Sequence, residues 1–205
     1  VNTRYQPNPG LKVADIPRLK LKWAFGYRGS YVYGAPVAVG GRVFATSSTG
    51  RVYSLDARSG CVHWTFDGET ATRSAVNIAT LPPGSPARLA AYFGDDNANY
   101  YAVDAESGRL LWKVRVHPHQ YARITGSAKV YRGTIYVPVS ALELVVAADR
   151  NYECCTFSGA VVALDARDGH VLWSTPVLPP ARAHRRSDVG TQLYGPAGAS
   201  VWNSP

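Results

Sequence analysis

Two adjacent cysteines, Cys154 and Cys155, are the most chemically distinctive pair in this 205-residue sequence. Neighbouring Cα atoms lie about 3.8 Å apart, which is below the usual disulfide separation of about 4.4–6.8 Å. A disulfide between these residues would therefore close a small ring and present a stiff, apolar plate. The alternative is a pair of ordinary buried thiols, the more common outcome for adjacent cysteines. Cys61 is left over, and we expect it to be a core thiol, with pairing to a cysteine outside these residues as the alternative.

A second group of side chains could bind an anion or a flat ring. Short Ala/Ser–Pro/Ala steps recur along the chain, and we expect each to begin an inner strand. The residues before these steps would then converge on a central channel. In this channel Arg73 and Arg123 could meet an anion, and Trp202 could stack on a flat ring. The alternative is a water-filled channel lined by polar and aromatic residues. The aligned pairs are Tyr33-Gly34, Thr72-Arg73, Thr125-Gly126 and Trp202-Asn203.

Three further signals for metal binding or catalysis are weaker. His117 and His119 flank a proline, and this favours a turn over a metal site. Glu143 is a weak candidate for a hard-cation ligand, although a lone carboxylate is usually solvated. Asp95-Asp96-Asn97 is typical of a tight turn between strands. The sequence contains no Ser-His-Asp pattern, Gly-rich phosphate loop or CxxC motif.

A repeated unit must position these residues, because the pattern small–apolar–Asp–Ala–x–x–Gly–x–x–x–Trp occurs three times, at 54–64, 102–112 and 163–173. The Asp ends a strand, and its carboxylate can accept backbone amides two residues further on. The Gly supplies a positive φ at the turn, and the following strand carries the Trp. The tryptophans lie 48 and 61 residues apart. A period of about 40–50 residues with four short strands indicates a β-propeller blade.

The sequence therefore predicts an all-β fold, a partial β-propeller of about three four-stranded blades plus flanking strands. Three blades cannot close a ring, since propellers have at least four. We therefore expect a fragment of a longer protein, inactive by itself, and an outer strand at 19–25 within the lead-in. The expected layout is a lead-in at 1–30, blades at about 31–66, 71–116 and 123–177, an interblade loop at 178–199 and the start of the next blade at 200–205.

Composition agrees with a β protein and argues against two classes of partner. The sequence has 13 Tyr, 19 Gly and 14 Pro, which favour strands and turns. The net charge of +8 comes from scattered basic residues, and their one cluster, Arg182, His184, Arg185 and Arg186, falls in the expected loop. We therefore expect no nucleic-acid binding. No signal peptide or membrane-spanning run is visible in these residues.

The Asp–Ala–x–x–Gly–x–x–x–Trp repeat resembles the tryptophan-docking motif of the quinoprotein alcohol dehydrogenases. Residues 2–6, 19–25, 152–157 and 195–202 are similar to the polyvinyl-alcohol-dehydrogenase-like branch of that family. Propellers without a cofactor share the repeat, so the Cys-Cys pair is the more specific part of the resemblance. The resemblance implies the N-terminal part of an eight-bladed propeller that binds pyrroloquinoline quinone (PQQ). The chain departs from the branch at Ser158, where the pattern has an arginine.

The resemblance also implies roles for individual residues. Cys154 and Cys155 would form a vicinal disulfide against one face of PQQ, with Trp202 as the candidate for the opposite face. Arg73, Arg123 and Thr125 would be candidate partners of the PQQ carboxylates and carbonyls, because a guanidinium fork suits a carboxylate. The catalytic Asp and most Ca²⁺ ligands would lie in later blades, so no catalytic residue is assigned here.

The implied activity is oxidation of an alcohol, whether small, secondary or polymeric. Ca²⁺ would act as a Lewis acid on the quinone, an Asp would take the hydroxyl proton, and a hydride would pass to PQQ. Cytochrome c would accept the electrons, and any haem c domain would lie outside these residues, which contain no CxxCH motif. The resemblance implies a periplasmic or secreted protein, consistent with a disulfide that needs oxidising conditions.

Two rival interpretations remain open. One is a propeller scaffold without catalysis that binds protein partners, resembling the lipoprotein of outer-membrane protein assembly. The other is a quinoprotein-like protein that no longer binds PQQ, for which Ser158 is the main support. The Cys-Cys pair and the channel Arg and Trp residues argue for the dehydrogenase, because a scaffold does not need them.

Overall fold

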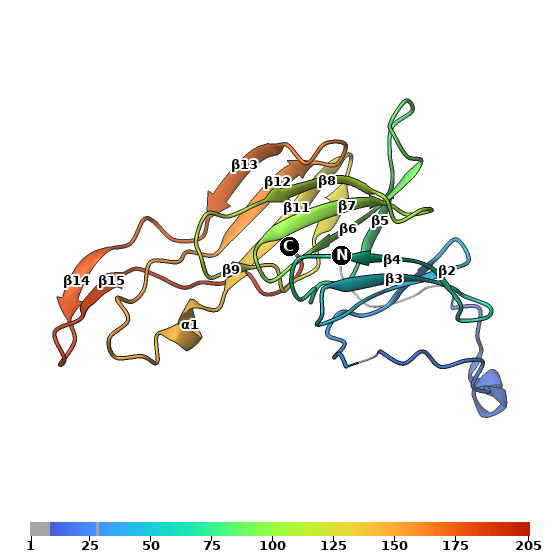
Figure 1. Ribbon diagram of the computed structural model, residues 1–205, viewed down its shortest axis with the longest axis horizontal. Helices are drawn as coiled ribbons and strands as arrows, with labels where there is room; N and C mark the ends of the chain where they lie inside the picture. The colour runs from blue at the N-terminus through green and yellow to red at the C-terminus, as the bar shows by residue number, and fades with distance from the viewer. Residues whose placement is uncertain (1–8, 28) are drawn as a thin grey trace.

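Three antiparallel sheets form the body of the protein, as the predicted all-β propeller fold requires (Figure 1). The computed structural model describes residues 9–27 and 29–205. In each sheet the four main strands are neighbours in chain order, and β9 (Ala122–Arg123) additionally pairs with the end of β11. The first sheet contains β1 (Val37–Val39), β2 (Arg42–Thr46), β3 (Arg51–Asp56) and β4 (Val62–Asp67). The second contains β5 (Asn77–Thr80), β6 (Leu89–Gly94), β7 (Asn99–Asp104) and β8 (Leu110–Arg115). The third contains β10 (Lys129–Tyr131), β11 (Thr134–Ala141), β12 (Ala160–Asp165) and β13 (Val171–Pro176).

The repeated turn connects the third and fourth strands of each sheet, as its sequence predicts. After β7, the Asp104 carboxylate accepts the N–H of Glu106 at 2.8 Å, and the Gly108 N–H donates to the Asp104 carbonyl at 2.8 Å. The indole N–H of Trp64, on β4 of the preceding sheet, donates to the Ala105 carbonyl of this turn at 3.1 Å. The predicted tryptophan docking is therefore confirmed. The same bond joins Trp23 to Ala57 at 3.2 Å and Trp112 to Ala166 at 3.3 Å.

The second sheet is buried on both faces because its central strands alternate their side chains. Tyr92 and Tyr100 pack in a core shared with the third sheet. Phe93 and Tyr101, one residue further along β6 and β7, pack in a core shared with the first sheet. Successive side chains of a strand point to opposite faces, so these two short strands supply both cores.

Two expectations for the segments outside the sheets are wrong. The expected loop at 178–199 contains an antiparallel hairpin of β14 (Arg182–Arg186) and β15 (Gln192–Gly195), at one end of the molecule (Figure 1). The β14 side chains are all exposed, so this strand lacks the apolar alternation by which a strand is recognised. No strand forms at 19–25, because no described segment pairs with it to supply ladder hydrogen bonds. Residues 2–6, which also carry the resemblance to the dehydrogenase branch, lie outside the described residues.

The structure also differs from the sequence predictions in two short helices and in the starting residues of the inner strands. A 3-10 helix, η1 (Val13–Arg18), lies in the lead-in, and α1 (Glu143–Val146) lies in the long connection between β11 and β12. The inner strands β1, β5 and β10 begin two or three residues after the first residue of each predicted Ala/Ser–Pro/Ala step. The residues before them form a connecting segment that faces the site described below.

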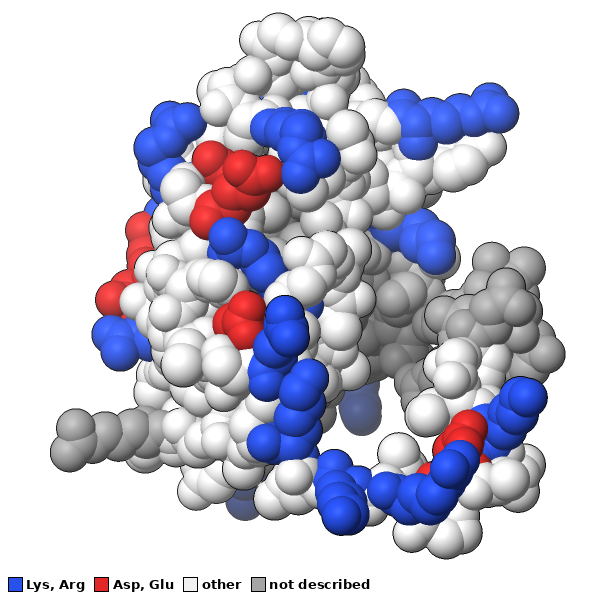
Figure 2. All heavy atoms as spheres, turned by 90° about the vertical axis from the view of Figure 1, so that its right-hand side faces the viewer, with Lys and Arg blue, Asp and Glu red and all other residues white. Residues whose placement is uncertain are grey.

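Lys and Arg are spread over the face shown in Figure 2, with Asp and Glu among them, rather than gathered in one patch. Several basic side chains are paired, including Arg51 with Asp67 and Arg88 with Glu106. Within residues 9–27 and 29–205, neither helix has the length and apolar content needed to cross a membrane.

Candidate functional site

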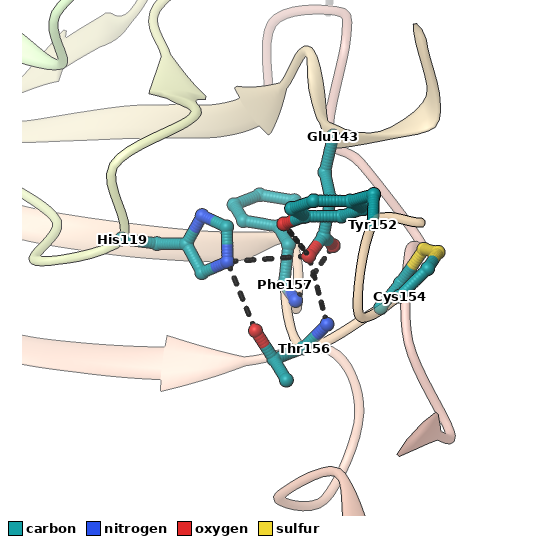
Figure 3. The surroundings of a disulfide bond; sticks show 7 residues. His119, Glu143, Tyr152, Cys154, Thr156 and Phe157 are labelled. Atoms are coloured by element: carbon teal, nitrogen blue, oxygen red, sulfur yellow. Dashed lines mark hydrogen bonds and ion pairs between the residues drawn. A yellow bond between two sulfur atoms is a disulfide. The ribbon is translucent and has the colours of Figure 1, made fainter. Parts of the chain in front are cut away.

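Cys154 and Cys155 are joined by a disulfide, which confirms the vicinal pair (Figure 3). Both are half-buried and lie in the loop between α1 and β12. The Cys154 carbonyl accepts the N–H of Tyr194 on β15 at 2.6 Å, so the hairpin contacts this loop. Cys61 is a free and exposed cysteine, not the expected core thiol, because it follows the turn glycine Gly60 at the surface.

The Glu143 side chain lies behind the disulfide loop and is only 3% exposed (Figure 3). Its Oε1 accepts the Tyr152 hydroxyl at 3.0 Å and the Thr156 N–H at 2.9 Å, and its Oε2 accepts the Phe157 N–H at 2.9 Å. The expectation that this carboxylate is solvated is therefore wrong. Both of its oxygens accept hydrogen bonds, and the weak candidacy of Glu143 as a cation ligand stays a prediction. Burial, and next the bond to Glu143, raise the pKa of Tyr152 to about 12.

Cys155 of the disulfide and Trp202 line the same cavity, which has a volume of about 400 Å³. Buried Phe157 also lines it, together with the chain at 197–200. The indole is carried by a segment tied to the third sheet, since the Val201 N–H donates to the Val139 carbonyl at 3.1 Å. Small-molecule sites have volumes of about 300–1,000 Å³, so this cavity has the size of a binding site.

A neighbouring cavity of about 520 Å³ shares Trp202 and collects the residues that the sequence alignment places together. The four predicted positions converge here, although Arg73, and not the buried Thr72, is the lining residue of its pair. Alternating burial of the connecting segments directs Arg73 and Thr125 toward the cavity. The Arg73 guanidinium stacks 4.4 Å from the ring centroid of Tyr33. The Thr125 hydroxyl is 2.8 Å from that of Ser140.

Arg123 does not line either cavity, because its guanidinium is paired with Asp96 at 2.9 Å. Burial raises the pKa of Asp96, and the positive charges of Arg123 and Arg73 partly offset this effect. The second carboxylate oxygen of Asp96 is buried without a hydrogen-bond partner in the described part of the chain. The predicted cofactor contact of Arg123 stays a prediction. The turn expected at 95–97 is confirmed.

His117 and His119 lie in a loop, as predicted, and pack on the ring of Phe157 at centroid distances of 5.4 and 5.5 Å. Burial, then the neighbouring His119 and Arg115, lower the pKa of His117. The His119 Nε2 atom lies 3.1 Å from the Thr156 hydroxyl and 3.4 Å from the Glu143 carboxylate. Among the described residues, no group of three or more His, Cys, Asp or Glu side chains is arranged to hold a metal ion.

Sequence reasoning missed the contacts of Glu143 with His119 and Tyr152. Glu143 and Tyr152 lie in the connection between β11 and β12, whereas His119 lies in the loop between β8 and β9, and no spacing pattern connects the three. The one sequence signal is the large aromatic residue Phe157 shortly after the cysteines. Its burial in the structure holds the end of this loop against the core.

Four-stranded antiparallel sheets linked by docked tryptophans, with a vicinal disulfide at a cavity, define a PQQ-type β-propeller protein. The family PQQ_2, described as outer membrane protein assembly factor BamB, matches residues 19–197, and the chain belongs to this family. The predicted resemblance to the polyvinyl-alcohol-dehydrogenase-like branch of the quinoprotein alcohol dehydrogenases is also confirmed. A polyvinylalcohol dehydrogenase of Pseudomonas sp is 45% identical over 100% of this chain and 32% of its own length.

A second polyvinylalcohol dehydrogenase, from Sphingopyxis sp. (strain 113P3), is 45% identical over 100% of this chain and 31% of its own length. The chain thus spans about a third of the length of these curated relatives. Among solved structures, quinohemoprotein alcohol dehydrogenase ADHIIG from Pseudomonas putida HK5 has a TM-score of 0.57 at 24% identity. The match covers 78% of this chain and 22% of that chain, and it supports the fold.

Proposed function

We propose that this chain contributes one wall of the PQQ site of an alcohol dehydrogenase. The observation that carries the proposal is that Cys155 of the vicinal disulfide and Trp202 line one cavity. The names of the two polyvinylalcohol dehydrogenases support an alcohol substrate, polymeric or secondary. Cytochrome c as electron acceptor, haem c on a domain outside these residues and a periplasmic location belong to the same proposal. The disulfide, which is favoured in oxidising compartments, supports this location.

The residues present fit a flat, anionic quinone. The disulfide, Phe157 and the indole of Trp202 offer apolar surfaces on which a planar ring can pack. The adjoining cavity offers the Arg73 guanidinium and the Thr125 hydroxyl, which suit carboxylates and carbonyl oxygens. The two cavities share Trp202, so apolar and polar contacts are available to one ligand.

Bound PQQ supplies a quinone that accepts a hydride from the alcohol. In this account the disulfide and Trp202 restrict the ring to one plane, and Arg73 and Thr125 fix its direction within that plane. Such positioning lowers the entropic barrier to the reaction by holding the reacting groups in place. The catalytic base and most Ca²⁺ ligands are expected in later blades.

The experiment is the substitution Cys154→Ser in the full-length protein, assayed by PQQ-dependent dye reduction. The variant is expected to lose the activity while it retains the fold, because the plate opens when one sulfur is removed. Cys61→Ser, which removes the exposed cysteine, is the matched control and is expected to remain active. Full activity of Cys154→Ser would refute the assignment of the plate.

A scaffold that binds protein partners is the second candidate function, and the family description favours it. A scaffold has no use for a quinone, so it predicts that the full-length wild-type protein neither binds PQQ nor reduces dye. The substitution experiment therefore separates the two functions through its wild-type arm.

A further inference from the structure

We propose that Glu143 is a positioning residue that holds the disulfide plate against the cavity. The inference rests on the proposed function for the purpose of the plate, because it assumes that the disulfide contacts PQQ. The anchoring itself rests on contacts within this chain and can be tested without PQQ.

The Glu143 carboxylate binds both sides of the cysteine pair (Figure 3). The Tyr152 hydroxyl approaches it from before the pair, and the N–H groups of Thr156 and Phe157 approach it from after the pair. A single carboxylate therefore fixes the chain on either side of Cys154 and Cys155. Hydrogen bonds to a charged acceptor are about twice as strong as those between neutral groups.

The position of Glu143 in the fold lets it transmit the rigidity of the sheet to the plate. It lies two residues beyond the end of β11, and Phe157 lies three residues before β12 begins. Strands β11 and β12 are hydrogen-bonded neighbours. The hydrogen bond from the Phe157 N–H to Glu143 thus closes the base of the inserted loop where it leaves and re-enters the sheet.

The contacts of Glu143 also explain why a charged side chain is tolerated here. A buried carboxylate is costly unless hydrogen bonds compensate it, and three donors and the nearby His119 surround this one. A glutamine of the same shape can present one oxygen, but its NH₂ group must face a donor. Glu143→Gln therefore leaves an N–H group or the hydroxyl without its acceptor and loosens the loop.

The test compares Glu143→Gln with Glu153→Gln in the full-length protein. Glu153 lies in the same loop next to Cys154 but is exposed, so its substitution removes the same charge without removing the anchor. Both variants carry Cys61→Ser so that the exposed thiol does not react. The first readout, made without PQQ, is the rate at which a limiting reductant opens the disulfide, followed by alkylation and mass measurement. The second readout is PQQ affinity from quenching of tryptophan fluorescence.

We expect the disulfide of Glu143→Gln to be reduced at least about tenfold faster than that of Glu153→Gln. We also expect Glu143→Gln to bind PQQ about tenfold more weakly. A factor of about ten corresponds to the loss of one hydrogen bond to a charged group. Tyr152→Phe removes one of the three bonds and should change both readouts in the same direction by less. This variant decides the test if Glu143→Gln does not fold.

Equal reduction rates in the two glutamine variants would overturn the inference. Faster reduction with unchanged PQQ affinity would also overturn it, because Glu143 would then protect the disulfide without positioning it. If the wild-type protein does not bind PQQ, the proposed function fails, and the reduction rates alone still decide whether Glu143 anchors the loop.

Discussion

The indole ring of Trp112 lies directly over the α-carbon of Gly169, where an added Cβ would come within 2.6 Å of the ring. The same ring donates its N–H to the Ala166 carbonyl of this turn. Gly169 has a φ of 75°, in the region that side chains other than glycine rarely adopt. One residue thus satisfies both the turn and the docking, and this explains why Asp, Gly and Trp recur together in the sequence.

Gly169→Ala is expected to lower the free energy of unfolding by about 2–5 kcal/mol, from the strain of a positive φ and from the clash with the indole. Gly133→Ala is the matched control, because Gly133 has a φ of 78° and nothing within 4 Å of an added Cβ. It should lose only the backbone part, about 1–2 kcal/mol. Urea unfolding measures both losses, and equal losses would show that the indole contact adds nothing.

His117 is expected to make the fold less stable in acid. Its folded-state pKa lies below the ordinary value of 6.5, mainly because of burial. As the pH falls below 6.5 the unfolded chain binds a proton more readily than the native protein, so stability falls until the folded-state pKa is reached. His117→Gln should flatten the dependence of the unfolding free energy on pH between about 7 and 5. Parallel curves for the two proteins would contradict this assignment.

Arg123→Gln is expected to destabilise the protein at pH 7 by about 2–3 kcal/mol, less than the 3–5 kcal/mol typical of a fully buried pair. The substitution leaves the Asp96 carboxylate without its partner and raises its pKa further above the ordinary value. A raised carboxyl pKa favours the native state as the pH falls, so the deficit should shrink toward pH 4. Unfolding curves at several pH values test this, and the double variant Asp96→Asn, Arg123→Gln should recover stability at pH 7.

Arg73→Gln is expected to weaken PQQ binding by about 10- to 100-fold, because a charge-assisted hydrogen bond is lost. Its guanidinium lines the cavity beside Trp202 and stacks on Tyr33. Arg88→Gln is the control, since Arg88 is exposed and pairs with Glu106. Fluorescence titration of both full-length variants measures the effect. Equal affinities would remove Arg73 from the site.

The repeat could be predicted from sequence because its turn is local. The Asp carboxylate and the positive-φ Gly act within one turn, and the Trp that follows docks on the same turn of the next sheet, so every unit carries all three residues at a constant spacing. The convergence of Arg73, Thr125 and Trp202 followed from aligning the repeats. Both predictions depend on the repetition of one structural unit along the chain, because equivalent residues of each unit take equivalent places in the fold.

The anchoring of Glu143 could not be predicted because its partners, Tyr152, Thr156 and Phe157, lie in one irregular loop that has no counterpart in the other repeats. Likewise, the hairpin of β14 and β15 carries charged side chains on exposed strands, so its sequence lacks the alternation that burial imposes. The sequence predicts Arg123 at the channel, whereas the structure pairs it with Asp96, which lies in a turn of the preceding sheet. Contacts of this kind are set by packing in three dimensions.

The most direct test of the dehydrogenase proposal is a PQQ titration of the full-length wild-type protein in the presence of Ca²⁺, followed by quinone absorbance and tryptophan fluorescence. We predict one PQQ bound per chain, with affinity lost in Cys154→Ser and retained in Cys61→Ser. Absence of quinone binding by a folded protein with an intact Cys154–Cys155 disulfide would contradict the proposal and leave the propeller as a scaffold.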